Sequence, residues 1–419
     1  MRILIWVKTA VASLVLATVA AAWALPPQLV SSGTTSGPYN GGASRALGVA
    51  TTVPPPGGRA AYVVTAQANS SNDMVVTAWQ NTTPELSDVG FDTVQGPGVY
   101  GIAITGLDSS RVVTADIDFT GNLLINTWSV SSAGVVPQNG SSTGAGVAYQ
   151  NVAITTLTST QVVTAYQLLD GTLAVEAWTI GADGYPTPAL PIATGDPADQ
   201  VSIATVNANQ VVTAINDETD QAGVLQVATW GVDSTGVQPQ GHVRTTYPVN
   251  AQGESVGVGA GNMFLFRDSF PFFQYFQAAV TPILNGSNVE VVNWAISESG
   301  ALTQTNTPIP TATYNDVAVA GSMLPENAAI TAYGNNDGFA TIGGLPPWSV
   351  VPNIDGNGIN SIATTTAGTA NYNSLGLFDA YLVTAVLAYT DDLNTPTADP
   401  TAVLKIREYS YRLRGPFGY

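Results

Sequence analysis

The repeat that decides the fold is clearest in residues 161–178, QVVTAYQLLDGTLAVEAW. Its opening phrase, Val162-Val163-Thr164-Ala165, predicts a β-strand because β-branched residues favour extended backbone. Asp170-Gly171 is a two-residue hairpin signal, and the apolar run that follows it predicts a second strand. Trp178 ends the motif 16 residues after Val162.

The same phrase recurs along the chain. Further clear copies start at Val63, Val112 and Val211, so successive starts lie 49 to 50 residues apart, and tryptophans follow them at Trp79, Trp128 and Trp230. Weaker copies are assigned to Phe264-Leu265-Phe266, Ala329-Ile330-Thr331-Ala332 and Leu382-Val383-Thr384-Ala385, followed by Trp294, Trp348 and Tyr409. Self-similarity at a fixed period of this length is typical of repeat architectures such as propellers.

Each copy is interpreted as four strands. In the third copy they are residues 152–155, 161–167, 173–180 and a Pro-containing outer strand ending near Ile192. The strands are apolar on both faces, as expected for a sheet buried between two neighbouring sheets. Seven copies therefore predict one all-β domain over residues 25–419, a seven-bladed β-propeller of four-stranded blades. Six or eight blades remain alternatives, because copies five and six are irregular.

The two ends of the chain predict how the ring is closed. Residues 28–37 resemble the outer strand of another copy, residues 135–144, whereas the last copy ends at its third strand, residues 403–413. We therefore expect the N-terminal strand to complete the last blade.

The pattern V-V-T-A, short acidic turn, L-x-V-x-x-W resembles the repeats of exported bacterial β-propellers over nearly the whole mature chain. The resemblance is to the fold and to no particular subfamily, and WD, kelch and calcium-cage signatures are absent from the sequence. It implies an architecture rather than an activity.

Residues 1–24 predict a signal peptide. Arg2 and Lys8 form a positive start, residues 9–21 are apolar, and Ala22-Trp23-Ala24 fits the small-x-small cleavage pattern. The alternative is an uncleaved N-terminal anchor. We expect a secreted protein, extracellular or periplasmic, with no transmembrane segment in the mature chain.

Composition excludes several classes of function. With 29 Asp+Glu against 11 Lys+Arg, the net charge is −18, which argues against nucleic acid as a partner. The absence of cysteine excludes disulfides and thiolate chemistry, and the single histidine, His242, argues against catalytic triads and multi-histidine metal sites. The expected partners are carbohydrate or a protein surface, and the sequence does not indicate an oligomeric state.

Candidate ligand-binding residues are the acidic ones expected between second and third strands, namely Asp116, Asp118, Asp170, Asp217 and Asp268. In a propeller these turns emerge on one face. The alternative is that aspartate is present because it caps turns. An aromatic run at residues 270–276, including Phe272, Phe273 and Tyr275, is expected to form a stacking platform on the same face, or else to be a buried strand.

Metal and catalytic signals are incomplete. Asp355 and Asn357 are spaced like the opening of a calcium loop, but the later ligands of such a loop are missing. The sequence suggests no cofactor other than calcium. The string at residues 253–257, GESVG, lacks a later histidine, and GPGVYG at residues 96–101 lacks a following helix. No catalytic residue is assigned. We expect a binding module, with a polysaccharide-acting enzyme using paired carboxylates or a structural envelope protein as alternatives.

Overall fold

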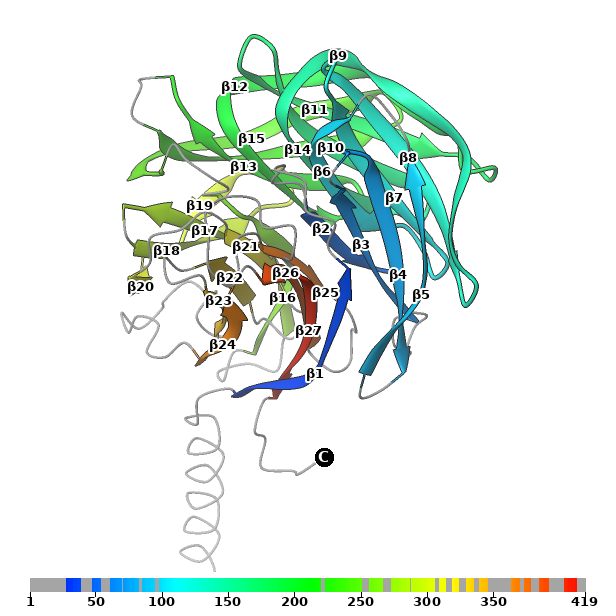
Figure 1. The fold of residues 1–419 in the computed structure, drawn as a ribbon. Helices are drawn as coiled ribbons and strands as arrows, with labels where there is room; N and C mark the ends of the chain where they lie inside the picture. The colour runs from blue at the N-terminus through cyan, green and yellow to red at the C-terminus, as the bar shows by residue number, and fades with distance from the viewer. Residues whose placement is uncertain are drawn as a thin grey trace, which may run out of the picture.

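The computed structural model of the chain is all-β (Figure 1). It describes residues 28–38, 47–53, 61–69, 71–82, 85–94, 98–219, 223–250, 256–266, 273–286, 288–305, 309–313, 319–323, 329–334, 339–345, 363–369, 373–377, 384–391 and 403–412. Within these ranges every regular element is a strand and none is a helix.

Antiparallel sheets of four neighbouring strands build the fold. The first contains β2 (Leu47–Thr51), β3 (Tyr62–Ala68), β4 (Met74–Thr82) and β5 (Glu85–Val94). A continuous path of ten follows: β6 (Val99–Gly106), β7 (Arg111–Asp118), β8 (Asn122–Ser131), β9 (Gly134–Thr158), β10 (Gln161–Leu168), β11 (Thr172–Ile180), β12 (Pro186–Asn207), β13 (Gln210–Asp217), β14 (Val224–Asp233) and β15 (Gly236–Pro248).

The second half of the chain continues the pattern. One sheet contains β16 (Gly259–Phe266), β17 (Phe273–Asn285), β18 (Asn288–Ile296), β19 (Leu302–Gln304) and β20 (Ile309–Thr313). The next contains β21 (Val319–Met323), β22 (Ala329–Gly334), β23 (Phe339–Leu345) and β24 (Ala363–Thr369). In the last, β25 (Asn373–Leu377), β26 (Thr384–Asp391) and β27 (Val403–Arg412) are joined by β1 (Gln28–Pro38), the strand that the sequence predicts as their partner.

Strands β9 and β12 each pass from one four-stranded sheet into the next. Val147 pairs with Asn122 of β8, whereas Ala148 pairs with Leu168 of β10. In β12 the partner changes in the same way between Pro197 and Ala198. Residues 149–151 and 197–200, where the chain passes from one four-stranded sheet to the next, therefore lie within strands. Because register shifts accompany each change, the strand bends without leaving the sheet.

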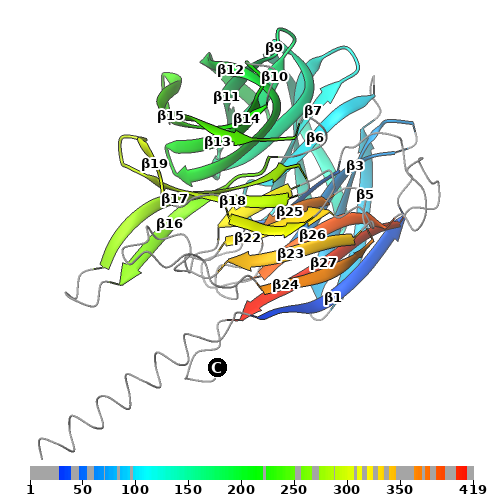
Figure 2. The same ribbon diagram turned by 90° about the vertical axis from the view of Figure 1, so that its left-hand side faces the viewer.

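We number the four-stranded sheets as units 1 to 5, starting with β2–β5, β6–β9 and β9–β12 and ending with β12–β15 and β16–β19. The first strands of successive units contact one another, from β2 to β6, β9, β12 and β16. The series continues through β21 and β25, and β25 contacts β2. Figure 2 shows β1 beside β27 at the edge of the last sheet. Threonine hydroxyls tie neighbouring first strands together: Thr105 Oγ1 lies 2.9 Å from Thr156 Oγ1, and Thr155 Oγ1 lies 2.9 Å from Thr205 Oγ1.

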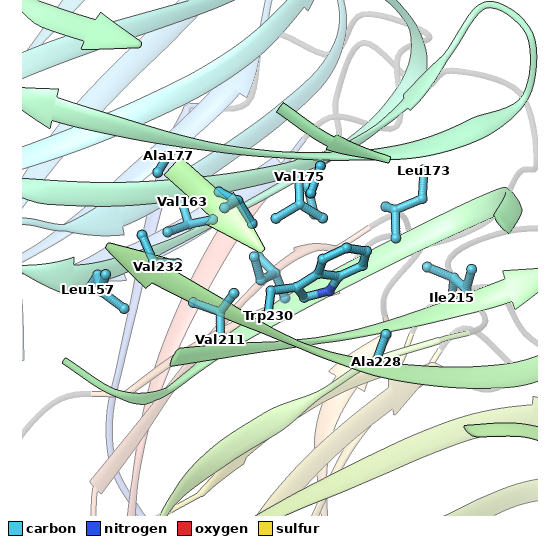
Figure 3. Packing of buried hydrophobic residues seen from close by; sticks show 14 of the residues in the cluster. Leu157, Val163, Leu173, Val175, Ala177, Val211, Ile215, Ala228, Trp230 and Val232 are labelled. Atoms are coloured by element: carbon cyan, nitrogen blue, oxygen red, sulfur yellow. The ribbon is translucent and has the colours of Figure 1, made fainter. Parts of the chain in front are cut away.

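The hydrophobic core lies between successive units. Trp230 of unit 4, for example, packs with Val163 and Val175 of unit 3 (Figure 3). Trp128 and Trp178 likewise belong to clusters formed with the preceding unit. These tryptophans and Trp294 therefore fill the boundary with the unit before their own, which explains why the strands are apolar on both faces.

One hydrogen-bonded pair explains the repeated phrase. In unit 3 the Trp178 indole Nε1–H donates to Thr164 Oγ1 at 2.9 Å, and the Thr164 hydroxyl donates to Glu176 O at 3.3 Å. The threonine of V-V-T-A thus satisfies a buried indole that would otherwise lose its hydrogen bond to water. The same indole-to-hydroxyl bond occurs in the pairs Trp79–Thr65, Trp128–Thr114, Trp230–Thr213 and Trp294–Thr281.

The assignment of the fifth copy from sequence is wrong. Phe264-Leu265-Phe266 belongs to β16, the first strand of its unit, and the tryptophan partner is Thr281 in β17. Because Phe266 pairs with Phe273, residues 267–272 connect a first strand to a second strand. The second-to-third turn of this unit is at Gly286 instead.

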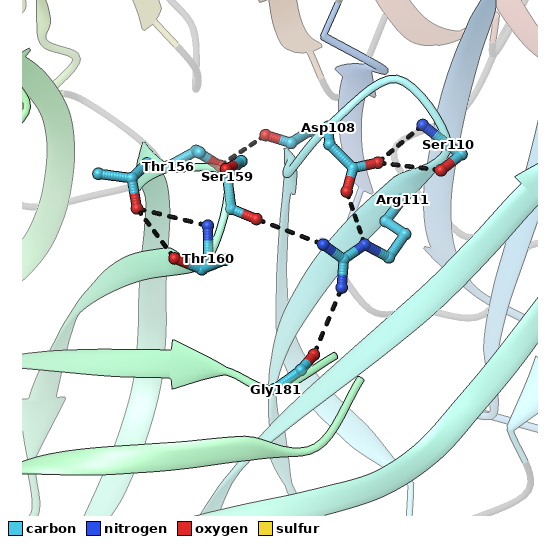
Figure 4. A network of polar contacts seen from close by, with 9 residues as sticks. Asp108, Ser110, Arg111, Thr156, Ser159, Thr160 and Gly181 are labelled. Carbon is cyan, nitrogen blue, oxygen red and sulfur yellow. Dashed lines mark hydrogen bonds and ion pairs between the residues drawn. The ribbon is translucent and has the colours of Figure 1, made fainter. Parts of the chain in front are cut away.

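Polar contacts also join units at the face opposite to the second-to-third turns. Arg111, at the start of β7, donates from Nε to Asp108 Oδ2 at 2.6 Å (Figure 4). Its terminal nitrogens reach the carbonyl oxygens of Ser159 at 3.4 Å and Gly181 at 3.5 Å, both in unit 3. One guanidinium group thereby links unit 2 to two turns of the next unit.

Candidate functional site

The turns between second and third strands form one continuous face, which we call the acidic face. In units 1 to 4 a carbonyl of this turn accepts a hydrogen bond from the chain that leads into the next first strand. The bonds run from Val99 N to Asn72 O (3.0 Å), Ala148 N to Gly121 O (2.7 Å), Ala198 N to Gly171 O (2.8 Å) and Val249 N to Gly223 O (2.9 Å). Consecutive turns are therefore held side by side by backbone, whatever their side chains.

Asn72 occupies the turn position that other units fill with glycine. Its φ of 61° is left-handed, like those of Gly121 at 82° and Gly171 at 87°. Asparagine tolerates this region better than other residues with a Cβ. We expect Asn72→Ala to lower the free energy of unfolding by about 1 kcal/mol and Asn72→Gly to change it by less than about 0.5 kcal/mol, measured by urea denaturation. Equal losses in both variants would assign the effect to the side chain and not to φ.

Aspartates close the turns of this face. In unit 2, Asp118 Oδ1 accepts from Thr120 N at 2.8 Å and Thr120 Oγ1 at 2.7 Å, and Oδ2 accepts from Asn122 Nδ2 at 3.0 Å. Asp170 accepts from Thr172 N at 3.0 Å and from its hydroxyl at 2.7 Å. Asp217 accepts from Thr219 N at 2.9 Å and from Arg244 Nε. A D-x-T turn is thus repeated in three successive units.

The carboxylates in these turns are stabilised in the charged form. Burial acts to raise the pKa of Asp118, but the hydrogen bonds from Thr120 and Asn122 outweigh it and leave the pKa below its ordinary value. The pKa of Asp217 is lowered in the same way against burial, with Thr219 and Arg244 as donors. Hydrogen bonds from Thr172 lower the pKa of Asp170. These side chains remain ionised at neutral pH and give the face its negative charge.

Asp116 has a different environment. It lies in β7, 3% exposed, and its Oδ1 accepts a hydrogen bond from Asn126 Nδ2 at 2.9 Å. Burial raises the pKa of Asp116 to about 7, reinforced by the charge of Asp118 and opposed by the bond from Asn126. Asp116 is therefore a carboxyl group that titrates near neutral pH inside the boundary between units.

An exposed aromatic pair lies on the acidic face. The rings of Tyr100 and Phe119 have centroids 4.4 Å apart and an interplanar angle of 51°, and the two side chains are 51% and 42% exposed. Gly98 supports Phe119, because a Cβ at Gly98 would lie 2.4 Å from the ring. Phe119 N also donates to Gly98 O at 3.1 Å. Leu169, 64% exposed in the neighbouring turn, adds apolar surface.

Neither aromatic residue of this pair is among the residues predicted from sequence. The sequence does carry a signal: Phe119 lies between Asp118 and Thr120 in a turn that is otherwise polar. The glycine string at residues 96–101 has a structural role here, since Gly98, with φ of 86°, leaves room for the Phe119 ring.

The remaining predicted residues belong to copy five. Asp268 and Phe272 lie outside the described residues. Phe273 and Tyr275 begin β17, paired with Phe266 and Phe264. Phe273 and Tyr275 therefore lie at the end of β17 that is remote from the second-to-third turn at Gly286.

The two residues predicted to open a calcium loop, Asp355 and Asn357, lie outside the described residues. Among the residues that are described, no group of three or more His, Cys, Asp or Glu side chains is placed to hold a metal ion. In the same part of the chain no helix is long and apolar enough to cross a membrane.

Two carboxylates interact near the start of a first strand. Glu218 follows Asp217 in the unit 4 turn, and Asp199 lies opposite, at the register shift between Ala198 and Gln200. Burial, and then the charge of Asp199, raises the pKa of Glu218, and burial raises the pKa of Asp199. The acidic face therefore concentrates negative charge at this turn.

Comparisons with known proteins show distant structural likeness only. No family model and no curated protein matches the chain. Saccharomyces cerevisiae Sqt1 aligns with 90% of this chain and 98% of its own at 14% identity and a TM-score of 0.49. A putative 6-phosphogluconolactonase from Bacteroides fragilis aligns with 87% and 91% at 11% identity and 0.48. The SapL1 lectin in complex with alpha methyl fucoside aligns with 72% and 93% at 13% identity and 0.41. At these values the function has to be argued from the site itself.

Proposed function

We propose that the protein is an exported seven-bladed β-propeller that binds carbohydrate on its acidic face and catalyses no reaction. The pairing of β1 with β27 and the contact of β25 with β2 support a closed ring. Export is supported by the charged start, apolar run and cleavage pattern of residues 1–24.

The observation that carries the proposal is the exposed pair Tyr100 and Phe119. Sugar rings present C–H faces that stack on aromatic rings, while side-chain and backbone polar groups bind their hydroxyls. Asp170 offers an exposed carboxylate in the next turn, and the backbone bonds between turns keep it in a fixed position relative to Phe119. Ligand contacts by Asp116, Asp118 and Asp217 stay predictions, as do calcium binding and the contribution of Phe272, Phe273 and Tyr275.

Replacing Phe119 by alanine is expected to weaken binding about tenfold, because an aromatic contact contributes about 0.5–1.5 kcal/mol beyond burial. The measurement is a glycan array followed by titration calorimetry with the best ligand. Phe91→Ala is the matched control, since Phe91 is 65% exposed on the outer strand β5. Loss of affinity in Phe91→Ala but not in Phe119→Ala would place the site elsewhere.

A polysaccharide-acting enzyme is the second candidate, and the interacting carboxylates Asp199 and Glu218 favour it. A raised pKa beside an ionised carboxylate is the environment of a general acid. Incubation with the array's polysaccharides should then release products, and Glu218→Gln should abolish their release. Unchanged polysaccharides would leave binding as the function.

A further inference from the structure

The basic side chains that the structure describes are paired with carboxylates. Arg244 binds Asp217 at an acidic turn, and Arg111 binds Asp108 at the opposite face. His242 lies 3.5 Å from Asp196. Lysine is absent from residues 9–404 of the sequence. The described side chains of the acidic face therefore offer a ligand the exposed carboxylates of Asp170 and Glu218, and the cation described there, Arg244, is bound to Asp217.

Two carboxylates follow the aromatic pair in the next two turns of the acidic face. Asp170 is exposed in the turn next to Phe119, and Glu218 is exposed in the turn after that. The order is fixed by the bonds from Ala148 N to Gly121 O and from Ala198 N to Gly171 O. A sugar oligomer bound along the second-to-third turns of units 2 to 4 would contact the aromatic rings first and the carboxylates next.

We propose that the ligand of the acidic face is a sugar oligomer that carries free amines, of the glucosamine type, stacked on Tyr100 and Phe119 with its ammonium groups beside Asp170 and Glu218. This rests on the proposed function and narrows it to one class of carbohydrate. Ammonium groups are attracted to both aromatic faces and carboxylates. Acidic sugars are disfavoured by like charge.

The charge of the turn at Glu218 supports this choice. The charge of Asp199, which lies opposite Glu218 at the start of β12's second half, adds to burial in raising the pKa of Glu218, and a cation beside the two carboxylates would offset that repulsion. A neutral N-acetylated sugar has the same ring faces but supplies no cation, so it should bind by stacking alone. The contrast between the two sugars therefore isolates the charge from the carbohydrate backbone.

The test compares the glucosamine tetramer with the N-acetylglucosamine tetramer by titration calorimetry on the exported protein. At about 10 mM salt we expect about tenfold tighter binding of the amine-bearing tetramer, and at about 1 M salt nearly equal affinities. Glu218→Gln should reduce the preference about threefold. Glu298→Gln removes the same charge from a third-to-fourth turn on the opposite face and should leave the preference unchanged.

Each other outcome overturns a defined part of the proposal. Equal affinities at low salt would remove the amine preference while leaving carbohydrate binding intact. Absence of binding by both tetramers and by every glycan of the array would overturn the proposed function as well. Tighter binding of a lysine tetramer than of the glucosamine tetramer, lost in Phe119→Ala, would assign the face to a basic protein surface instead.

Discussion

Replacement of Trp178 by alanine is expected to lower the free energy of unfolding by about 3–5 kcal/mol, the usual cost of removing a large buried aromatic side chain. Trp178 is fully buried and packs with Val113 and Ile117 of unit 2 and with Val162 of its own unit. The cavity would open at the boundary between two rigid sheets, which cannot easily collapse to fill it. Urea denaturation of the purified variant measures the loss.

The indole hydrogen bond accounts for a separable part of this cost. Thr164→Val keeps the shape of the side chain but removes the acceptor of the Trp178 Nε1–H and the donor to Glu176 O. A buried donor left without a partner costs about 1–3 kcal/mol. We therefore expect Thr164→Val to be destabilising, but less so than Trp178→Ala.

Tyr185→Ala provides the control for removal of an aromatic side chain. Tyr185 lies seven residues further along the chain and is 46% exposed. Its replacement by alanine should lower the free energy of unfolding by less than about 0.5 kcal/mol. A loss below about 1 kcal/mol in Trp178→Ala would contradict the view that the tryptophans hold neighbouring units together.

The sequence predicts the strands of the clear copies well. The second and third strands expected at residues 161–167 and 173–180 correspond to β10 and β11, and the hairpin at Asp170-Gly171 is confirmed. These elements are local: the β-branched run, the turn and the next run all lie within twenty residues. Their prediction therefore needs no knowledge of long-range contacts.

Copy five shows where local patterns fail. The strand that contains Thr281 reads Ala279-Val280-Thr281-Pro282, so two of the four residues of the repeated phrase are changed. The aromatic residues of β16 match an apolar strand better, so the sequence pattern predicts the fifth copy of the phrase there. What identifies the correct strand is the Thr281–Trp294 hydrogen bond, which depends on the pairing of β17 with β18.

The candidate site was predicted in part. The acidic turns follow from residue type and period, and Asp118, Asp170 and Asp217 do fall at second-to-third turns. The aromatic pair could not be predicted, because Tyr100 and Phe119 meet only through the pairing of Val99 with Asp118. Likewise, Asp116 and Asp118 are both 3% exposed, and their hydrogen-bond donors distinguish them: Asp118 accepts from Thr120 and Asn122, whereas Asp116 accepts from Asn126 of the adjacent strand.

Replacement of Asp116 by asparagine is expected to stabilise the protein above neutral pH. The pKa of Asp116 is raised from 3.8 to about 7 in the folded state, so between these values the folded protein binds the extra proton. Stability therefore falls as pH rises from about 4 to about 7 and changes no further above the folded pKa. The free energy of unfolding that is lost over this pH range has an upper limit on the order of 4 kcal/mol.

Asparagine removes the titration while keeping an oxygen that accepts from Asn126 Nδ2. The difference in unfolding free energy between Asp116→Asn and the parent protein should be smallest near pH 5 and grow towards pH 8, measured by urea denaturation across this range. Asp170→Asn is the matched control, because the pKa of the exposed Asp170 is lowered and its charge is constant over the same range. If Asp116→Asn and Asp170→Asn change stability in parallel at every pH, the Asp116 carboxyl is not held in its neutral form by burial between units 1 and 2.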